Sequence, residues 1–91
     1  MIDFDLPERV SVAGDNALVP FLRQHPDAPL RIHANRLRRL DTPLVQTLLA
    51  AAADRRRRGI DFVLTGLSSA QADQLAALGV TTAVLPMELA E

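Results

Sequence analysis

The stretch RRLDTPLVQTLLAAAADRRRRG, from Arg38 to Gly59, predicts a long helix with a defined start and a defined end. Thr42 is well placed as its N-cap, and Pro43 at the first helical position loses no hydrogen bond. The four arginines before Gly59 lie at the negative end of the helix dipole, and Gly59 can take the left-handed conformation that ends a helix. One apolar stripe predicts the face that packs on a sheet: Leu44, Val45, Leu48, Leu49 and Ala52.

The segments on either side of this helix predict strands. Leu30 to Ala34 alternates apolar residues with Arg31 and His33, which is typical of a strand with one wet face. The segment DFVLTG, residues 61–66, carries a run of three apolar residues and predicts a more central strand. The long helix therefore connects two strands.

The C-terminal part of the chain predicts one more helix and one more extended segment. In SSAQADQLAALG, residues 68–79, Ser68 and Gln71 have the spacing of a capping box, and Gly79 is the expected terminator. The segment TTAVLP, residues 81–86, is predicted to be a final strand or an extended tail.

The N-terminal part predicts a strand and a short helix. The segment DFDLPERVSV, residues 3–12, is a short strand or extended lead-in, and Pro7 restricts it to a sheet edge. The segment DNALVPFLRQH, residues 15–25, has helical spacing of apolar residues, with Pro20 either delaying or bending the helix. The breaker cluster HPDAP, residues 25–29, ends it.

This alternation of strands and helices predicts an α/β domain with a largely parallel sheet. A chain of 91 residues corresponds to one domain, residues 1–91. The net charge of −1 gives no drive toward nucleic acid or anionic lipid, and the absence of cysteine excludes disulfides and thiolate metal sites. We expect a cytoplasmic protein without membrane insertion, because no apolar run approaches ~20 residues and the acidic start does not resemble a signal peptide.

The order and spacing of motifs from Arg38 to Val80 resemble the STAS domain family, the module of anti-sigma-factor antagonists and of small subunits of bacterial signalling and transport systems. Family members have a strand ending in a hydrophobic-Asp-(Ser/Thr)-(Ser/Ala)-Gly motif, an apolar helix, a glycine-terminated basic helix end, a strand, a serine-led helix and a Leu-Gly pair. The matching residues here are Leu40, Asp41, Thr42, Pro43, Gly59, Phe62 to Leu64, Ser68, Leu78 and Gly79.

The resemblance implies a mixed, mostly parallel sheet of about four strands, with three main helices packed mainly on one face. It also implies a partner-docking domain without enzymatic activity and without a cofactor. In the antagonists, a partner kinase phosphorylates a serine two residues after the Asp, and that position here is Pro43, which has no hydroxyl. In lipid-transport subunits of this fold, a Thr beside the Asp lies at the contact with the ATPase, and Asp41 and Thr42 map onto that pair.

Two kinds of protein partner follow from the resemblance. The leading hypothesis is bacterial signalling of the anti-sigma-antagonist kind or linked to chemotaxis or a histidine kinase. The alternative is a cytoplasmic subunit of an ABC-type phospholipid transporter that binds its ATPase. Thr42 is the phosphorylation candidate, although an unmodified contact is favoured. The expected partner-binding residues are Asp41, Thr42, Pro43, Leu44, Arg38, Arg39 and Gln46, and the same face leaves homodimerisation open.

Other candidate sites have simpler interpretations. His25 and His33 have no acidic residue at ligand spacing on their own element, so we expect surface histidines and no metal. The arginines at 36, 38, 39 and 55–58 are interpreted as solvated helix ends. Nucleic-acid binding is disfavoured, because the chain has no Tyr or Trp for stacking on bases. Binding to an acidic groove on a protein partner ranks between these two interpretations. The segments GDN, residues 14–16, and TGLSS, residues 65–69, lack the spacing of phosphate loops. A catalytic or nucleotide-binding domain is a third, weaker hypothesis, since no catalytic constellation is visible.

Overall fold

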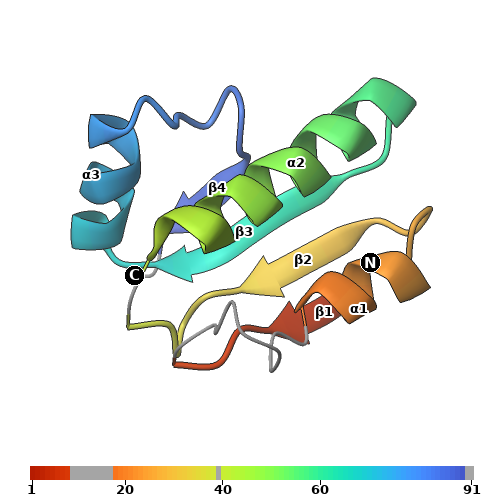
Figure 1. The fold of residues 1–91 in the computed structure, drawn as a ribbon, viewed down its shortest axis with the longest axis horizontal. Helices are drawn as coiled ribbons and strands as arrows, with labels where there is room; N and C mark the ends of the chain where they lie inside the picture. Colours follow the sequence, from red (N-terminus) through yellow and green to blue (C-terminus); the bar gives the residue numbers. More distant parts are fainter. Residues whose placement is uncertain (9–17, 39, 90–91) are drawn as a thin grey trace.

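The computed structural model describes residues 1–8, 18–38 and 40–89, which form four strands and three helices in alternation (Figure 1). The predicted Gly14 to Asn16 segment, most of the lead-in after Pro7, and Arg39 lie outside the described residues. In chain order the elements are β1 (Ile2–Asp5), α1 (Leu18–Gln24), β2 (Leu30–His33), α2 (Thr42–Arg58), β3 (Phe62–Leu67), α3 (Ser69–Ala77) and β4 (Met87–Leu89).

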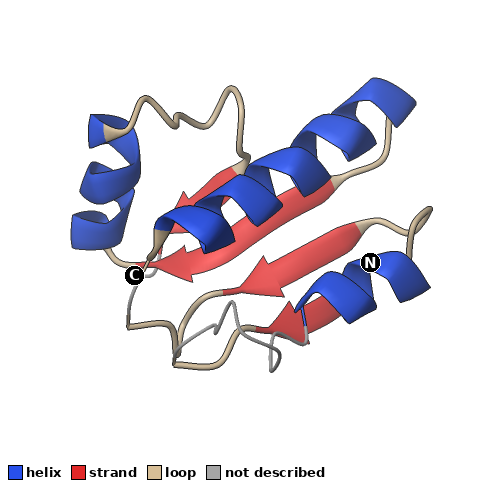
Figure 2. Cartoon of the chain, viewed as in Figure 1, coloured by secondary structure: helices blue, strands red, loops and turns tan. Residues whose placement is uncertain are grey.

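The strands form one sheet in the order β1-β2-β3-β4, and every neighbouring pair is parallel. Leu30 and Ile32 of β2 pair with Phe62 and Leu64 of β3 at the centre of the sheet. Helices α1 and α2 lie over one face, and α3 lies beside the carboxyl end of β3 (Figure 2). The predicted α/β fold with about four strands and three helices is confirmed, and its sheet is fully parallel among the described residues.

The core lies between this sheet and α2. Strand residues alternate between a buried face and an open face, as the sequence of β2 predicted. On the open face lie polar side chains such as Asp3, Arg31 and His33. The core residues contributed by the two central strands and by α2 are Leu30, Ile32, Phe62, Leu64, Leu67, Leu44, Val45, Leu48, Ala51 and Ala52.

The helix ends follow the sequence closely in α2 and α3. Gly59 closes α2 with φ 71°, the left-handed conformation that was expected. Ser68 and Gln71 form the predicted capping box, in which each side chain accepts a hydrogen bond from the other residue's backbone N–H. Pro20 lies in the first turn of α1, where its missing N–H costs no helical hydrogen bond.

The prediction of a strand at residues 81–86 is wrong, because the last strand is Met87–Leu89. The Thr81 hydroxyl oxygen accepts from Ala83 N at 3.3 Å, and Leu85 N donates to Thr81 O at 3.0 Å. Such local hydrogen bonds compete with strand pairing, and β-branched composition alone does not reveal them. Leu85, fully buried, anchors the turn to the core.

Candidate functional site

The start of α2 forms an exposed lip at the carboxyl edge of the sheet, which we define as Asp41, Thr42 and Pro43. Asp41, rather than Thr42, is the N-cap: its backbone is extended, with φ −104° and ψ 165°, and its carboxylate accepts from Leu44 N at 3.1 Å. The prediction that Thr42 caps the helix is therefore wrong. A carboxylate is favoured at the positive end of the helix dipole, and Pro43 is tolerated one position further into the first turn.

The residues of the lip differ in exposure. Thr42 and Pro43 are exposed, as is Gln46 one turn further on, while Asp41 is half-buried. Leu44 is only 2% exposed, so its side chain belongs to the core and is not part of the lip surface. The expectation that Leu44 binds the partner is therefore wrong, whereas its predicted place in the buried stripe of α2 is confirmed.

The Thr42 side chain has no hydrogen-bond partner among the described residues. The neighbouring Thr47 hydroxyl instead donates to Pro43 O at 2.9 Å, which satisfies a carbonyl of the first turn. Capping by Asp41 has released the Thr42 hydroxyl from a structural role. Thr42 is thus an exposed polar group that the fold of the described chain does not use.

The same geometry makes the lip a poor phosphate site. Of the backbone N–H groups in the first turn, Pro43 has none, Leu44 N donates to the Asp41 carboxylate, and Val45 N donates to Asp41 O at 3.1 Å. An anion on Thr42 would find few free donors and would lie beside the Asp41 carboxylate. An unmodified Thr42 therefore fits this lip better than a phosphorylated one.

Arg38, which was expected to help bind the partner, lies in the loop before the lip. Its backbone N donates to Glu8 O at 2.9 Å, while its guanidinium lies 3.7 Å from the Glu8 carboxylate. The Arg38 side chain is 76% exposed, so this ion pair is weak. Arg38 therefore remains available for contact with a partner.

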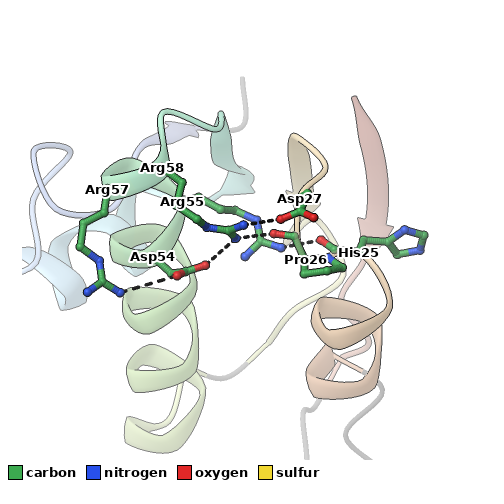
Figure 3. Close-up of polar contacts among 7 residues, drawn as sticks. All are labelled: His25, Pro26, Asp27, Asp54, Arg55, Arg57 and Arg58. Carbon is green, nitrogen blue, oxygen red and sulfur yellow. Dashed lines mark hydrogen bonds and ion pairs between the residues drawn. The ribbon is translucent and has the colours of Figure 1, made fainter.

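Three of the four arginines at the other end of α2 bond to neighbouring loops, which corrects the expectation of simple helix-end solvation. Figure 3 shows the contacts of Arg55 and Arg58 with the loop after α1. Arg56 donates to Ala83 O at 2.8 Å, in the turn before β4. Arg58 donates to Asp27 and to Pro26 O, and it also bonds Asp54 at 2.6 Å. These contacts hold the loop after α1 and the turn before β4 to the end of α2.

Arg55 is the one charged residue buried among the described residues, with 3% of its surface exposed. Its guanidinium donates to His25 O at 2.7 Å and lies 5.9 Å from the centre of the Phe62 ring. Its Nε atom has no hydrogen-bond partner in the described part of the chain. Burial disfavours the charged form and lowers the pKa of Arg55 below its ordinary value.

A line of hydrogen bonds that sequence reasoning missed crosses the open face of the sheet. His33 on β2 bonds Asp3 on β1 through Nε2 at 2.7 Å, and bonds the Thr65 hydroxyl on β3 through Nδ1 at 2.9 Å. Because a carboxylate only accepts, Nε2 is the donor to Asp3. This line links three strands, so His33 is more than the isolated surface histidine that was expected.

The Asp3–His33 contact predicts an acid-dependent contribution to stability. Hydrogen bonding to His33, followed by the charges of His33 and Arg31, lowers the pKa of Asp3 below its ordinary 3.8. A carboxylate with a lowered folded-state pKa stabilises the fold above its unfolded pKa and loses that contribution as pH falls through the folded value. We therefore expect Asp3→Asn to lower stability slightly at pH 5 to 7, and we expect the difference from the parent protein to disappear as the pH falls below 3.8 and through the lowered folded-state pKa.

Urea unfolding across this pH range measures the effect. Asp5→Asn is the matched control, because Asp5 is exposed on the same strand face and has no hydrogen bond from its side chain within the described residues. A constant difference between Asp3→Asn and the parent protein at every pH would contradict the assignment.

Among the described residues, no group of three or more His, Asp or Glu side chains is placed to hold a metal ion. In the same part of the chain, no helix combines the length and apolar character needed to span a membrane.

A family model described as "Mlab, STAS domain" matches residues 5–87, which is nearly the whole chain. The chain belongs to the STAS domain family. The searches of curated proteins and of solved structures returned no match to this chain. STAS domains are generally non-catalytic modules, and the resemblance seen in the motifs from Arg38 to Val80 is thereby confirmed at the level of the family.

Proposed function

We propose that this STAS domain is a protein-interaction module that docks a protein partner on the lip and on Gln46. The observation that carries the proposal is the exposed Thr42 at the start of a helix whose opposite side is buried. Its hydroxyl has no structural partner in the described chain, and the adjacent Asp41 carboxylate is fixed by its cap hydrogen bond. A preorganised polar corner of this kind binds a partner with little loss of side-chain freedom.

Two partner classes fit this surface. In a signalling system, the partner is an anti-sigma factor or kinase, and the lip binds it without a phosphoserine, because Pro43 occupies that position. In a phospholipid transporter, the partner is the ATPase. The Asp41–Thr42 pair resembles the ATPase contact of lipid-transport subunits and favours the second class.

Thr42→Glu tests the docking surface. The substitution adds a negative charge beside Asp41 on an exposed position, so we expect partner affinity to fall about tenfold or more, equivalent to about 1.4 kcal/mol. The melting temperature should change by no more than a few degrees, because Thr42 is exposed, is not the cap residue, and a carboxylate is favoured in the first turn of a helix. Affinity is measured by calorimetry with a candidate transporter ATPase and a candidate kinase, and stability by circular dichroism.

Thr82→Glu is the matched control, since Thr82 is also exposed but lies in the turn before β4. Unchanged affinity of Thr42→Glu, or an equal loss in Thr82→Glu, would count against the lip. Binding to the ATPase but not to the kinase would select the transporter role. Phosphate found on Ser68 or Ser69 but never on Thr42 would remove Thr42 as a modification site.

A further inference from the structure

A second surface feature lies beside the lip, at the same edge of the sheet. It is a groove between the loop of residues 35–38 and the first turns of α3, with Gly66 of β3 among its lining residues. Its polar lining consists of Asn35, Arg38, Ser68, Gln71 and Gln74. Of these residues, only Arg38 was among the expected partner-binding residues.

The walls of the groove are held together by one side chain. The Gln71 amide oxygen accepts from Ser68 N at 3.0 Å, while its nitrogen donates to Leu37 O at 2.9 Å. Gln71 therefore ties the start of α3 to the loop before the lip. The groove is a fixed feature of the fold rather than a gap between independent loops.

The groove presents hydrogen-bond donors that the rest of the described chain leaves unused. The exposed Asn35 and Gln74 side-chain amides have no hydrogen-bond partner among the described residues, and Arg38 has only its 3.7 Å contact with Glu8. No aspartate or glutamate is found among the lining residues. The groove is therefore rich in donors and carries a positive charge.

The arginines at the opposite end of α2 differ in this respect. The guanidinium groups of Arg55, Arg56 and Arg58 donate hydrogen bonds to backbone carbonyls and carboxylates of the same chain. Arg38 makes no comparable contact and is 76% exposed. In the cluster at the far end of α2 only Arg57 is comparably exposed, whereas Arg38 is the free arginine that lies beside the lip.

We propose that the groove receives an acidic peptide segment of the protein that docks on the lip. A carboxylate of that segment pairs with the Arg38 guanidinium, and the Asn35 and Gln74 amides donate to its further carboxylates or to its backbone carbonyls. Only two residues separate Arg38 from Asp41, so a partner that covers the lip also reaches the groove. The inference rests on the proposed docking function and specifies the chemistry of the partner.

The test uses the full chain and two capped six-residue peptides, one of alternating aspartate and leucine and one of alternating asparagine and leucine. The peptides are titrated into the ¹⁵N-labelled protein and followed by NMR. We expect the acidic peptide to shift the side-chain amide signals of Asn35 and Gln74, and the neutral peptide to leave them in place. Raising the salt from about 50 mM to about 500 mM should weaken the acidic peptide's binding.

Arg38→Gln is expected to weaken acidic-peptide binding about fivefold or more, since it removes the charge while keeping a polar side chain. Arg57→Gln is the matched control, because Arg57 is equally exposed and has only a 3.6 Å contact with Asp54 at the far end of α2. Equal losses in the two variants, equal binding of the neutral peptide, or the same shifts with inorganic phosphate in place of the peptide would overturn the inference.

The proposals for the lip and for the groove can be tested independently of each other. If Thr42→Glu abolishes partner binding while Arg38→Gln leaves peptide binding unchanged, the docking lip is supported and the groove inference is overturned. If peptide binding depends on Arg38 while Thr42→Glu leaves partner affinity unchanged, the groove is supported as an acidic-peptide site and the lip is rejected.

Discussion

Arg55→Ala is expected to lower the free energy of unfolding by about 2–3 kcal/mol. The substitution removes a charge-assisted hydrogen bond and a desolvated cation–π contact, and the loss is partly offset because a charge no longer has to be buried. The side chain is 3% exposed, donates to His25 O and lies over Phe62. Its truncation leaves a cavity between α2 and the loop after α1 and removes the partner of a backbone carbonyl. In a chain of 91 residues, this corresponds to a fall in melting temperature of roughly 10–20 °C.

Two further substitutions separate the reasons for this loss. Arg57→Ala removes an exposed arginine from the same helix end and should cost less than about 0.5 kcal/mol. Arg55→Met keeps much of the buried volume and removes both the charge and the unpaired Nε, so we expect it to be less destabilising than Arg55→Ala. Urea denaturation of the three variants measures the differences. An Arg55→Ala protein as stable as Arg57→Ala would show that the buried guanidinium contributes nothing.

The helical periodicity of α2 predicts its buried face up to Ala52, and the same periodicity also includes Arg55. The stripe of Leu44, Leu48 and Ala52 was predicted, and these residues are buried. Continuing by three residues from Ala52 reaches Arg55, which lies on the same face. The signal was therefore present in the spacing, but four successive arginines at a helix end have the composition of a solvated terminus.

The start of α2 illustrates a different limit. In the sequence Asp41-Thr42-Pro43, both Asp and Thr are good N-caps, and Pro is accepted at either of the first two helical positions. The choice between them depends on where the preceding loop delivers the chain, which local preferences do not encode. The helix and its exposed start could be predicted from the sequence. It could not be predicted that Asp41 caps the helix and leaves the Thr42 hydroxyl available to a partner.

Long-range pairs account for most of what the sequence did not reveal. Asp3 and Thr65 meet His33 only because β1, β2 and β3 pair in parallel with a defined register. The groove likewise depends on Gln71 reaching Leu37 O across 34 residues of sequence. No local pattern marks such contacts, while a capping box such as Ser68–Gln71 is complete within four residues and was predicted correctly.

Gly66→Ala is expected to lower the free energy of unfolding by about 1–2 kcal/mol, because the substitution imposes left-handed backbone strain and displaces the exposed Asn35 side chain. Gly66 has φ 81°, and a Cβ at this position would lie 2.4 Å from Asn35 Oδ1. Gly66 also coincides with a register shift in β3, since Thr65 pairs with Glu88 and Leu67 pairs with Leu89. One extra residue in β3 turns Leu67 toward the core, where it is fully buried.

Gly59→Ala provides the control for the backbone term alone. Gly59 has a similar φ of 71°, but a Cβ there meets nothing within 4 Å, so we expect a cost of only about 1 kcal/mol. Asn35→Ala removes the atoms that the new Cβ would meet. In that background, Gly66→Ala should cost less than in the parent protein by the free energy of displacing the Asn35 side chain, as a double-mutant cycle of unfolding free energies would measure.

The outcome of this cycle also bears on the groove, because Asn35 and Gly66 both line it. If Gly66→Ala costs no more than Gly59→Ala and the two substitutions at 35 and 66 are additive, the close approach does not hold Asn35 in place. If they are strongly coupled, the glycine is what allows the Asn35 amide to lie against β3, where it can meet an acidic segment. The bulge that buries Leu67 and the position of Asn35 in the groove then both depend on the left-handed conformation of Gly66. One backbone feature would therefore shape both the core and the groove.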